Sequence, residues 1–385
     1  MSLAVPVRLS RSQRERQRRR RRIYGVLTRL YRALFPSSAG ARLRADVVRR
    51  LLLVRDDRIG DLIVTTPLID FLRSVAPHAE VDVVCSRANA AVLLGDARVS
   101  HVFVNDGTWI GRVRLVLALR RRAYDATFSV IPGNGVREGW FACLVARRHT
   151  ARVSIWRPKR YHGFFTRVAR SPWSLTLMPD QVLHVGVSSF AGPARSIATG
   201  DWPMRMHIPA ESAEVVSQFL ARADIPDFVA VNLWAAEAWR VWPPNRCAEV
   251  LQRLTARNAS LHVVLTPPPG RAPDAAAVRS AVDSPRIHVF PADARLADRA
   301  ALIARSRLAI TCNTAVVPMA SAFGRPVVGL YSSRPADRNE RYLPRDVPQR
   351  IVYAPPGGAV CDIRPDDVIA AYDALVAELE RSKRG

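Results

Sequence analysis

Apolar residues of this chain gather into short continuous runs and helix-spaced stripes, which alternate from residue 49 onward. Continuous runs predict buried strands, and stripes with the period of a helix turn predict amphipathic helices. We predict helices near 62–75, 111–121 and 365–381, and strands near 50–55, 80–85, 100–104, 126–131, 228–233, 261–265, 287–290, 308–310 and 326–330. Such alternation is typical of an α/β protein with parallel, doubly wound sheets.

The alternation stops between residues 150 and 205, where Arg, Trp, Pro and Ser replace the apolar runs. We interpret this stretch as a loop-rich segment at a domain junction. A chain of 385 residues also exceeds the length at which a single core stops growing. We therefore predict a basic arm with an amphipathic helix over 1–46, a first doubly wound domain over 47–205 and a second over 206–385.

The N-terminal arm concentrates positive charge. Arginines crowd the segment Arg8–Arg22, and like charges at this density keep a chain extended until it meets an anionic partner. The stripe that follows has helical spacing and comprises Ile23, Val26, Leu27, Leu30, Tyr31, Leu34 and Phe35. A basic amphipathic helix binds anionic membrane surfaces, although this stripe could also pack on the protein's own body. We expect Arg8–Phe35 to bind the inner-membrane surface.

The composition narrows the location and the partners. The formal net charge is +25, almost entirely from arginine, and reflects either a compositional bias or attraction to anionic partners. The five cysteines are far apart and form no C-x-x-C pair, so we expect a cytoplasmic protein without structural zinc or a disulfide framework. No apolar run is long enough to span a bilayer.

Several enzyme classes lack their motifs here. No G-x-G-x-x-G follows the first predicted strand and no G-x-x-x-x-G-K-[ST] occurs, which argues against dinucleotide oxidoreductases and P-loop ATPases. Neither G-x-S-x-G nor a metal-spaced His/Cys cluster is present, which argues against serine hydrolases and metalloenzymes. We expect no cofactor and no metal site.

Two polar stretches follow predicted strands directly and open helices. Arg55–Pro67 follows the apolar run Leu51–Val54, and Cys312–Pro326 follows Leu308–Thr311. Ligands of open parallel sheets bind at such handover points. The N–H groups at the start of the second helix would point at an anion.

Three motifs in matching order give the chain a family resemblance. They are Asp57-Arg58-Ile59-Gly60-Asp61 with Thr65-Thr66-Pro67, then Arg240-Val241-Trp242-Pro243, and then Asn313-Thr314-Ala315 followed by residues 320–328. Over about residues 48–380 the chain resembles glycosyltransferase family 9, the ADP-heptose:lipopolysaccharide heptosyltransferases. The resemblance implies the GT-B fold, two doubly wound Rossmann-like domains facing across a cleft.

The resemblance also implies an activity. It implies inverting, metal-independent transfer of a heptose-like sugar from ADP-heptose, or a related donor, to lipopolysaccharide or another lipid-linked anionic glycan acceptor. Asp61 corresponds to the family's general base, although Asp at this position could instead be a helix N-cap. Arg240 and the turn Asn313-Thr314-Ala315 correspond to groups that contact the donor diphosphate; a solvated arginine and a helix cap are the alternatives. Gly60, Arg58 and Thr65 complete the candidate substrate-binding set.

The third motif departs from the family pattern. Asn313 replaces an aspartate, Ala315 a glycine and Pro318 a histidine. These changes leave open another sugar or nucleotide, and also a non-catalytic GT-B-like protein that binds glycan. A nucleic-acid partner is disfavoured, because the basic arm lacks the interleaved aromatic residues of single-strand binders. The preferred hypothesis is a glycosyltransferase, peripheral on the cytoplasmic face of the bacterial inner membrane.

Overall fold

A computed structural model describes residues 26, 42–132, 136–147, 149–172, 174–192, 201–337 and 339–384. The predicted arm and amphipathic helix lie outside the described residues, apart from Val26 and residues 42–46. The membrane-binding role of Arg8–Phe35 therefore stays a prediction. Within the described ranges, no helix combines the length and the apolar character needed to cross a membrane.

The first sheet has six parallel strands in the order β3-β2-β1-β4-β5-β6. Its strands are β1 (Arg50–Arg55), β2 (Glu80–Ser86), β3 (His101–Asn105), β4 (Ala126–Ser129), β5 (Ala151–Ile155) and β6 (Arg167–Ala169). The helices of this half are α2 (Ile59–Ile63), α3 (Thr66–Val75), α4 (Trp109–Arg121), α5 (Val136–Val145) and α6 (Met178–Val187). The strand order reverses between β1 and β4, which is where open α/β sheets bind ligands.

The second sheet repeats this topology, with the order β12-β11-β10-β7-β8-β9. Its strands are β7 (Phe228–Asn232), β8 (His262–Leu265), β9 (Ile287–Val289), β10 (Leu308–Cys312), β11 (Val327–Tyr331) and β12 (Gln349–Tyr353). The helices of this half are α7 (Ala210–Arg222), α8 (Pro244–Arg257), α9 (Ala272–Val282), α10 (Leu296–Arg305), α11 (Val316–Ala322) and α12 (Pro365–Arg384). Here the order reverses between β7 and β10.

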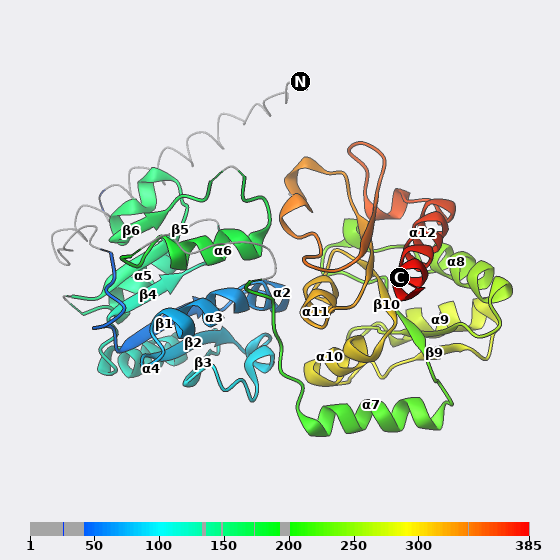
Figure 1. Ribbon diagram of the computed structural model, residues 1–385, viewed down its shortest axis with the longest axis horizontal. Coiled ribbons are helices and arrows are strands. Elements are labelled where there is room, and N and C mark those ends of the chain that lie inside the picture. Colours follow the sequence, from blue (N-terminus) through cyan, green and yellow to red (C-terminus); the bar gives the residue numbers. More distant parts are fainter. Residues whose placement is uncertain are drawn as a thin grey trace.

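Short 3₁₀ turns complete the described structure: η1 (Ala90–Leu93), η2 (Lys159–Phe164), η3 (Ala238–Arg240), η4 (Pro335–Asp337), η5 (Asn339–Arg341) and η6 (Val360–Asp362). Figure 1 shows the two sheets side by side, with α2 and α11 facing each other at the junction. One apolar cluster continues through this junction and includes Leu62 from the first half and Met319 from the second. The two halves therefore pack directly on each other.

The α/β architecture and the predicted strands are confirmed, but the expectation of a loop-rich segment over 150–205 is wrong. β5, β6 and α6 all lie within it. β5 was hidden because two of its buried positions are polar: Arg152 is 3% exposed and Ser154 is 0% exposed. The Arg152 guanidinium is satisfied in the interior, where its Nε donates to the Phe164 carbonyl at 2.9 Å. The proposed boundary between 205 and 206 stays a prediction.

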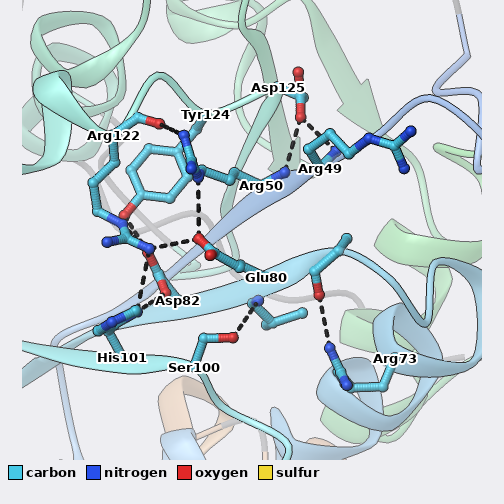
Figure 2. Close-up of polar contacts among 12 residues, drawn as sticks. Arg49, Arg50, Arg73, Glu80, Asp82, Ser100, His101, Arg122, Tyr124 and Asp125 are labelled. Carbon is cyan, nitrogen blue, oxygen red and sulfur yellow. Dashed lines mark hydrogen bonds and ion pairs between the residues drawn. The ribbon is translucent and has the colours of Figure 1, made fainter.

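The amino edge of the first sheet is held by a buried carboxylate, as Figure 2 shows. Asp82 is fully buried, and the Tyr124 hydroxyl donates to it at 2.6 Å. Arg122 Nε lies 2.6 Å from the same carboxylate, and His101 Nδ1 lies 3.0 Å from it. We call Asp82, His101, Arg122 and Tyr124 the Asp82 cluster. It ties together residues at the amino ends of β2, β3 and β4.

Candidate active site

The first and third sequence motifs meet at the junction of the two domains. The loop after β1 and the loop after β10 both leave the carboxyl end of a strand beside the point where strand order reverses. A Cβ built on Gly60 would lie 3.3 Å from Pro318 Cγ and 3.4 Å from Ala315 Cα. A side chain at Gly60 would therefore crowd the opposite domain. Two of the three residues that depart from the family pattern, Ala315 and Pro318, form this contact.

Asp61 lies in the first turn of α2 and is held by a buried guanidinium. Arg55 Nη2 donates to Asp61 Oδ1 at 2.7 Å, and Arg55 Nε donates to the Asp61 carbonyl at 3.0 Å. The Arg55 side chain is 0% exposed and that of Asp61 is 12% exposed. Arg58 occupies the N-cap of α2, without a side-chain cap bond. The structure therefore does not use Asp61 as an N-cap.

Arg55 also serves a second carboxylate. Its Nε lies 3.1 Å from Asp57 Oδ1, but without hydrogen-bond geometry, so that this oxygen has no hydrogen-bond partner among the described residues. Burial raises the pKa of Asp57 to about 6, opposed by the charge of Arg55 and assisted by that of Asp61. We call Arg55, Asp57 and Asp61 the Arg55 cluster. One guanidinium is shared there between two carboxylates.

Tyr342 brings the second domain to the Arg55 cluster. Its hydroxyl lies beside Asp61, and burial together with the nearby negative charge raises the pKa of Tyr342 to about 12. The carbonyl of Tyr342 accepts a hydrogen bond from the Tyr331 hydroxyl at 2.8 Å, which anchors this segment to β11. Asp61 is thus contacted from both domains. Sequence reasoning missed both contacts. A charged residue at the end of an apolar run, Arg55, could have indicated a buried ion pair. Nothing in the sequence around Tyr342 indicated its contact.

Two other predicted residues have supporting positions. Arg58 Nη2 donates to Glu237 Oε1 at 2.6 Å, which forms an ion pair between the domains. Its side chain remains 66% exposed. Thr65 is fully buried, and its hydroxyl donates to the Asp61 carbonyl at 2.8 Å. Thr65 therefore stabilises the turn that carries Asp61, and its hydroxyl is already occupied.

Arg240 lies at the end of η3 and is largely buried. Its Nη2 donates to Asp337 Oδ1 at 2.9 Å, while Nη1 lies 3.8 Å from Glu237. Its Nε is buried and has no hydrogen-bond partner within the described ranges. Burial acts to raise the pKa of Asp337, but hydrogen bonds from Ser332 and Arg240 bring it below its usual value. Arg240 is therefore a held side chain with one unused donor, rather than a freely solvated one.

A hydrogen-bond network joins the second and third motifs. Asn313 Nδ2 donates to Asn339 Oδ1 at 2.8 Å, and Asn339 Nδ2 donates to the Ser332 carbonyl at 2.5 Å. The Ser332 hydroxyl donates to Asp337, the partner of Arg240. Sequence reasoning missed Ser332, Asp337 and Asn339. These polar residues follow β11, which neighbours β10, so their position at the same sheet edge was the available signal.

Several polar groups of the turn at Thr314 already have hydrogen-bond partners within the protein. Its hydroxyl accepts hydrogen bonds from Asn232 Nδ2 at 3.1 Å and from the Val316 N–H at 3.2 Å. The Val317 N–H bonds to the Thr314 carbonyl at 3.2 Å, and Pro318 has no N–H. Fewer free N–H groups than the sequence predicted are therefore available here for an anion. In the part of the chain that is described, no group of three or more His, Cys, Asp or Glu side chains could hold a metal ion.

Comparison with known proteins agrees with this geometry. Residues 208–352 match the model of glycosyltransferase family 9 (heptosyltransferase). The structure is similar to a family 9 glycosyltransferase from Veillonella parvula, with a TM-score of 0.75 and 18% identity over 89% of this chain and 100% of that one.

Two Escherichia coli structures are also similar. ADP-heptose lipopolysaccharide heptosyltransferase II gives a TM-score of 0.70 at 17% identity, over 86% of this chain and 99% of that one. Heptosyltransferase WaaC with ADP gives 0.66 at 16% identity, over 85% and 99%. The family resemblance is thereby confirmed over residues 208–352, which match a glycosyltransferase family, and the similar structures confirm the GT-B fold.

Proposed function

We propose that this glycosyltransferase moves a heptose-like sugar from a nucleoside-diphosphate donor to lipopolysaccharide or another lipid-linked anionic glycan, with inversion and without a metal. The observation that carries the proposal is the position of Asp61. It lies at the domain junction, where Arg55 of its own domain donates a hydrogen bond to it and Tyr342 of the other domain lies beside it. A carboxylate fixed in this way can take a proton from an acceptor hydroxyl at a defined position.

The proposed step is a single displacement. The acceptor oxygen attacks the anomeric carbon while Asp61 takes its proton, and the bond from that carbon to the diphosphate oxygen breaks with its electron pair. The nucleoside diphosphate then leaves with the added negative charge. Arg240 and the turn Asn313-Thr314-Ala315 stabilise this charge, and the unused Nε of Arg240 is one donor for it.

ADP-heptose, or a related sugar nucleotide, is the donor we propose. Its support is that one E. coli neighbour is named for ADP-heptose and the other was solved with ADP. The membrane surface is the proposed location, with the arm Arg8–Phe35 as its anchor. The support here is the arginine block beside an apolar stripe at helical spacing.

Donor binding and turnover are tested separately. In a thermal-shift panel of nucleoside diphosphates and their sugars, a donor at about a hundred times its Kd stabilises the protein by roughly 2.7 kcal/mol. Transfer is then measured with that donor and a detergent-solubilised truncated lipopolysaccharide. Donor binding without transfer to any tested acceptor would favour the non-catalytic alternative, which the altered residues at the Gly60 contact also favour.

The variant Arg240→Ala tests the donor side. A charged hydrogen bond contributes about 1.5–3 kcal/mol, so the affinity for the nucleoside diphosphate should fall about tenfold to a hundredfold. Affinity for the nucleoside without phosphates should barely change. Arg246→Ala, on the neighbouring helix α8, is the control, because that guanidinium donates to the Ile363 carbonyl. Equal losses for nucleoside and diphosphate would place Arg240 away from the phosphates.

A further inference from the structure

Helix α4 of the first domain has an apolar face directed at solvent. Trp109 is 75% exposed, Ile110 50%, Val113 46% and Leu117 51%. At 3.6 residues per turn these four positions span an arc of about 100°. The opposite side of the helix packs on the core through Leu115 and Leu119. A surface helix ordinarily directs polar residues at solvent, so this cluster of exposed apolar side chains is a candidate contact surface.

One side chain of a neighbouring element extends this face. Together with Leu144 of α5, the α4 residues Trp109, Ile110, Val113 and Leu117 make five of the exposed large apolar side chains in the described ranges. Leu144 joins the face because Arg120 of α4 donates to its carbonyl at 3.0 Å. In the second domain the corresponding side chains, Val215, Trp239 and Tyr353, lie on separate elements. Figure 1 shows α4 on the part of the first domain remote from the second.

The charge around this face has one sign. The helix contains four arginines and no acidic residue. Arg114, Arg120 and Arg121 are exposed, and Arg87 in the turn after β2 is 74% exposed. The one carboxylate at the start of the helix, Asp106, lies 3.9 Å from Arg87. Apolar side chains, an exposed tryptophan and surrounding arginines are the composition of surfaces that lie in the interface of an anionic bilayer.

We propose that the outward face of α4 inserts into an anionic lipid surface and is a membrane contact separate from the N-terminal arm. The lipid contact would bring a lipid-linked acceptor to the site, and this role rests on the proposed function. Trp109 follows the carboxyl end of β3, on the sheet edge that also carries Asp61. A hydrogen bond joins the end of β3 to the loop of the first motif: Asn105 Nδ2 donates to Asp56 at 2.5 Å. Contact through α4 thus places this edge beside the lipid headgroups.

A polarity-sensitive fluorophore at position 113 tests the contact directly in the full chain. The label is attached to Val113→Cys in a Cys361→Ser background, because the other four cysteines are buried. Val215→Cys on α7 is the matched control, since Val215 is 42% exposed and Val113 46%. We expect vesicles of phosphatidylglycerol and phosphatidylethanolamine to shift the emission to the blue at 113 and not at 215, and phosphatidylcholine vesicles to shift neither.

Three outcomes would overturn the proposal. The first is unchanged emission at 113 while the protein sediments with the vesicles. The second is emission that is already blue without vesicles at every protein concentration, which would mean that this chain's own N-terminal segment covers the face. The third is a blue shift that grows with protein concentration without lipid, which would identify a second copy as the partner.

The paired variant Trp109→Asp with Leu117→Asp gives an independent measurement. Its affinity for the anionic vesicles should fall about tenfold or more, because two apolar side chains no longer leave water. Val215→Asp should bind as the parent protein does, and equal affinities of all three would contradict the proposal. Transfer to detergent-solubilised acceptor is measured in parallel. If that transfer is absent while position 113 still inserts, the proposed function fails and the lipid contact stands.

Discussion

Two buried ion clusters lie at opposite edges of the same sheet and differ in how their carboxylates are held. In the Asp82 cluster one carboxylate has a tyrosine, an arginine and a histidine around it. In the Arg55 cluster one guanidinium is divided between the carboxylates of Asp57 and Asp61. In the first cluster both oxygens of the buried carboxylate have hydrogen-bond partners, although Arg122 Nε has none within the described ranges. In the second cluster it is a carboxylate oxygen, Asp57 Oδ1, that has no hydrogen-bond partner there.

This difference follows the position of each cluster. The carboxyl edge, where open α/β sheets bind ligands, carries surplus negative charge, a raised pKa and contacts from both domains. At the amino edge the Asp82 carboxylate is fully buried among side chains of one domain. Functional sites commonly retain local conflicts that reduce stability. We therefore interpret the Asp82 cluster as stabilising the fold and the Arg55 cluster as serving the chemistry at some loss of stability.

The largest effect is expected from removing the shared guanidinium. Arg55→Met leaves Asp57 and Asp61 partly buried without their cation, so the free energy of unfolding should fall by about 3–5 kcal/mol. Urea unfolding measures it. Arg58→Met is the control, because its exposed ion pair with Glu237 contributes at most about 1 kcal/mol. Equal losses in the two variants would show that the burial of Arg55 has no energetic role.

The Asp82 cluster should respond almost as strongly in stability. Asp82→Asn removes the charge that Arg122 faces and leaves buried donors poorly paired, at a loss of roughly 2–4 kcal/mol. The loss is smaller than for Arg55, because Arg122 is 25% exposed and also pairs with Glu80 at 2.6 Å. Glu80→Gln, at a site 43% exposed, should cost much less. Asp82→Asn should transfer sugar at the normal rate per folded molecule. A slower rate would contradict a purely stabilising role for the Asp82 cluster.

A stabilising substitution is expected at Asp57. Its pKa is raised from 3.8 to about 6, so the folded protein binds this proton more tightly than the unfolded chain does. The resulting stabilisation is present in full below pH 3.8 and is lost as the pH rises through 6. At pH 7 Asp57→Asn should therefore be more stable than the parent by up to about 3 kcal/mol. Melting temperatures from pH 4 to pH 8 would test this, and parallel curves for the two proteins would refute it.

Sequence patterns predicted most of the fold and part of the site, for physical reasons. Runs such as Leu51–Val54 are continuous because parallel strands are buried on both faces, and Gly60-Asp61 follows one of them directly. β5 escaped because Arg152 and Ser154 are polar but internally bonded. Tyr342 escaped because its partner Asp61 is remote in the chain. Contacts of that kind arise only when the two domains pack.

The most direct test of the account compares substitutions of the two carboxylates that pair with the Arg55 guanidinium. Asp61→Asn and Asp57→Asn each remove one carboxylate from Arg55, and donor affinity, unfolding free energy and sugar transfer are measured for both. The account predicts that Asp61→Asn binds donor and folds normally while transfer falls about a hundredfold or more, the scale of a lost general base. Asp57→Asn should retain most of its transfer. Full transfer by Asp61→Asn, or equal losses in the two variants, would contradict the assignment of Asp61 as the base.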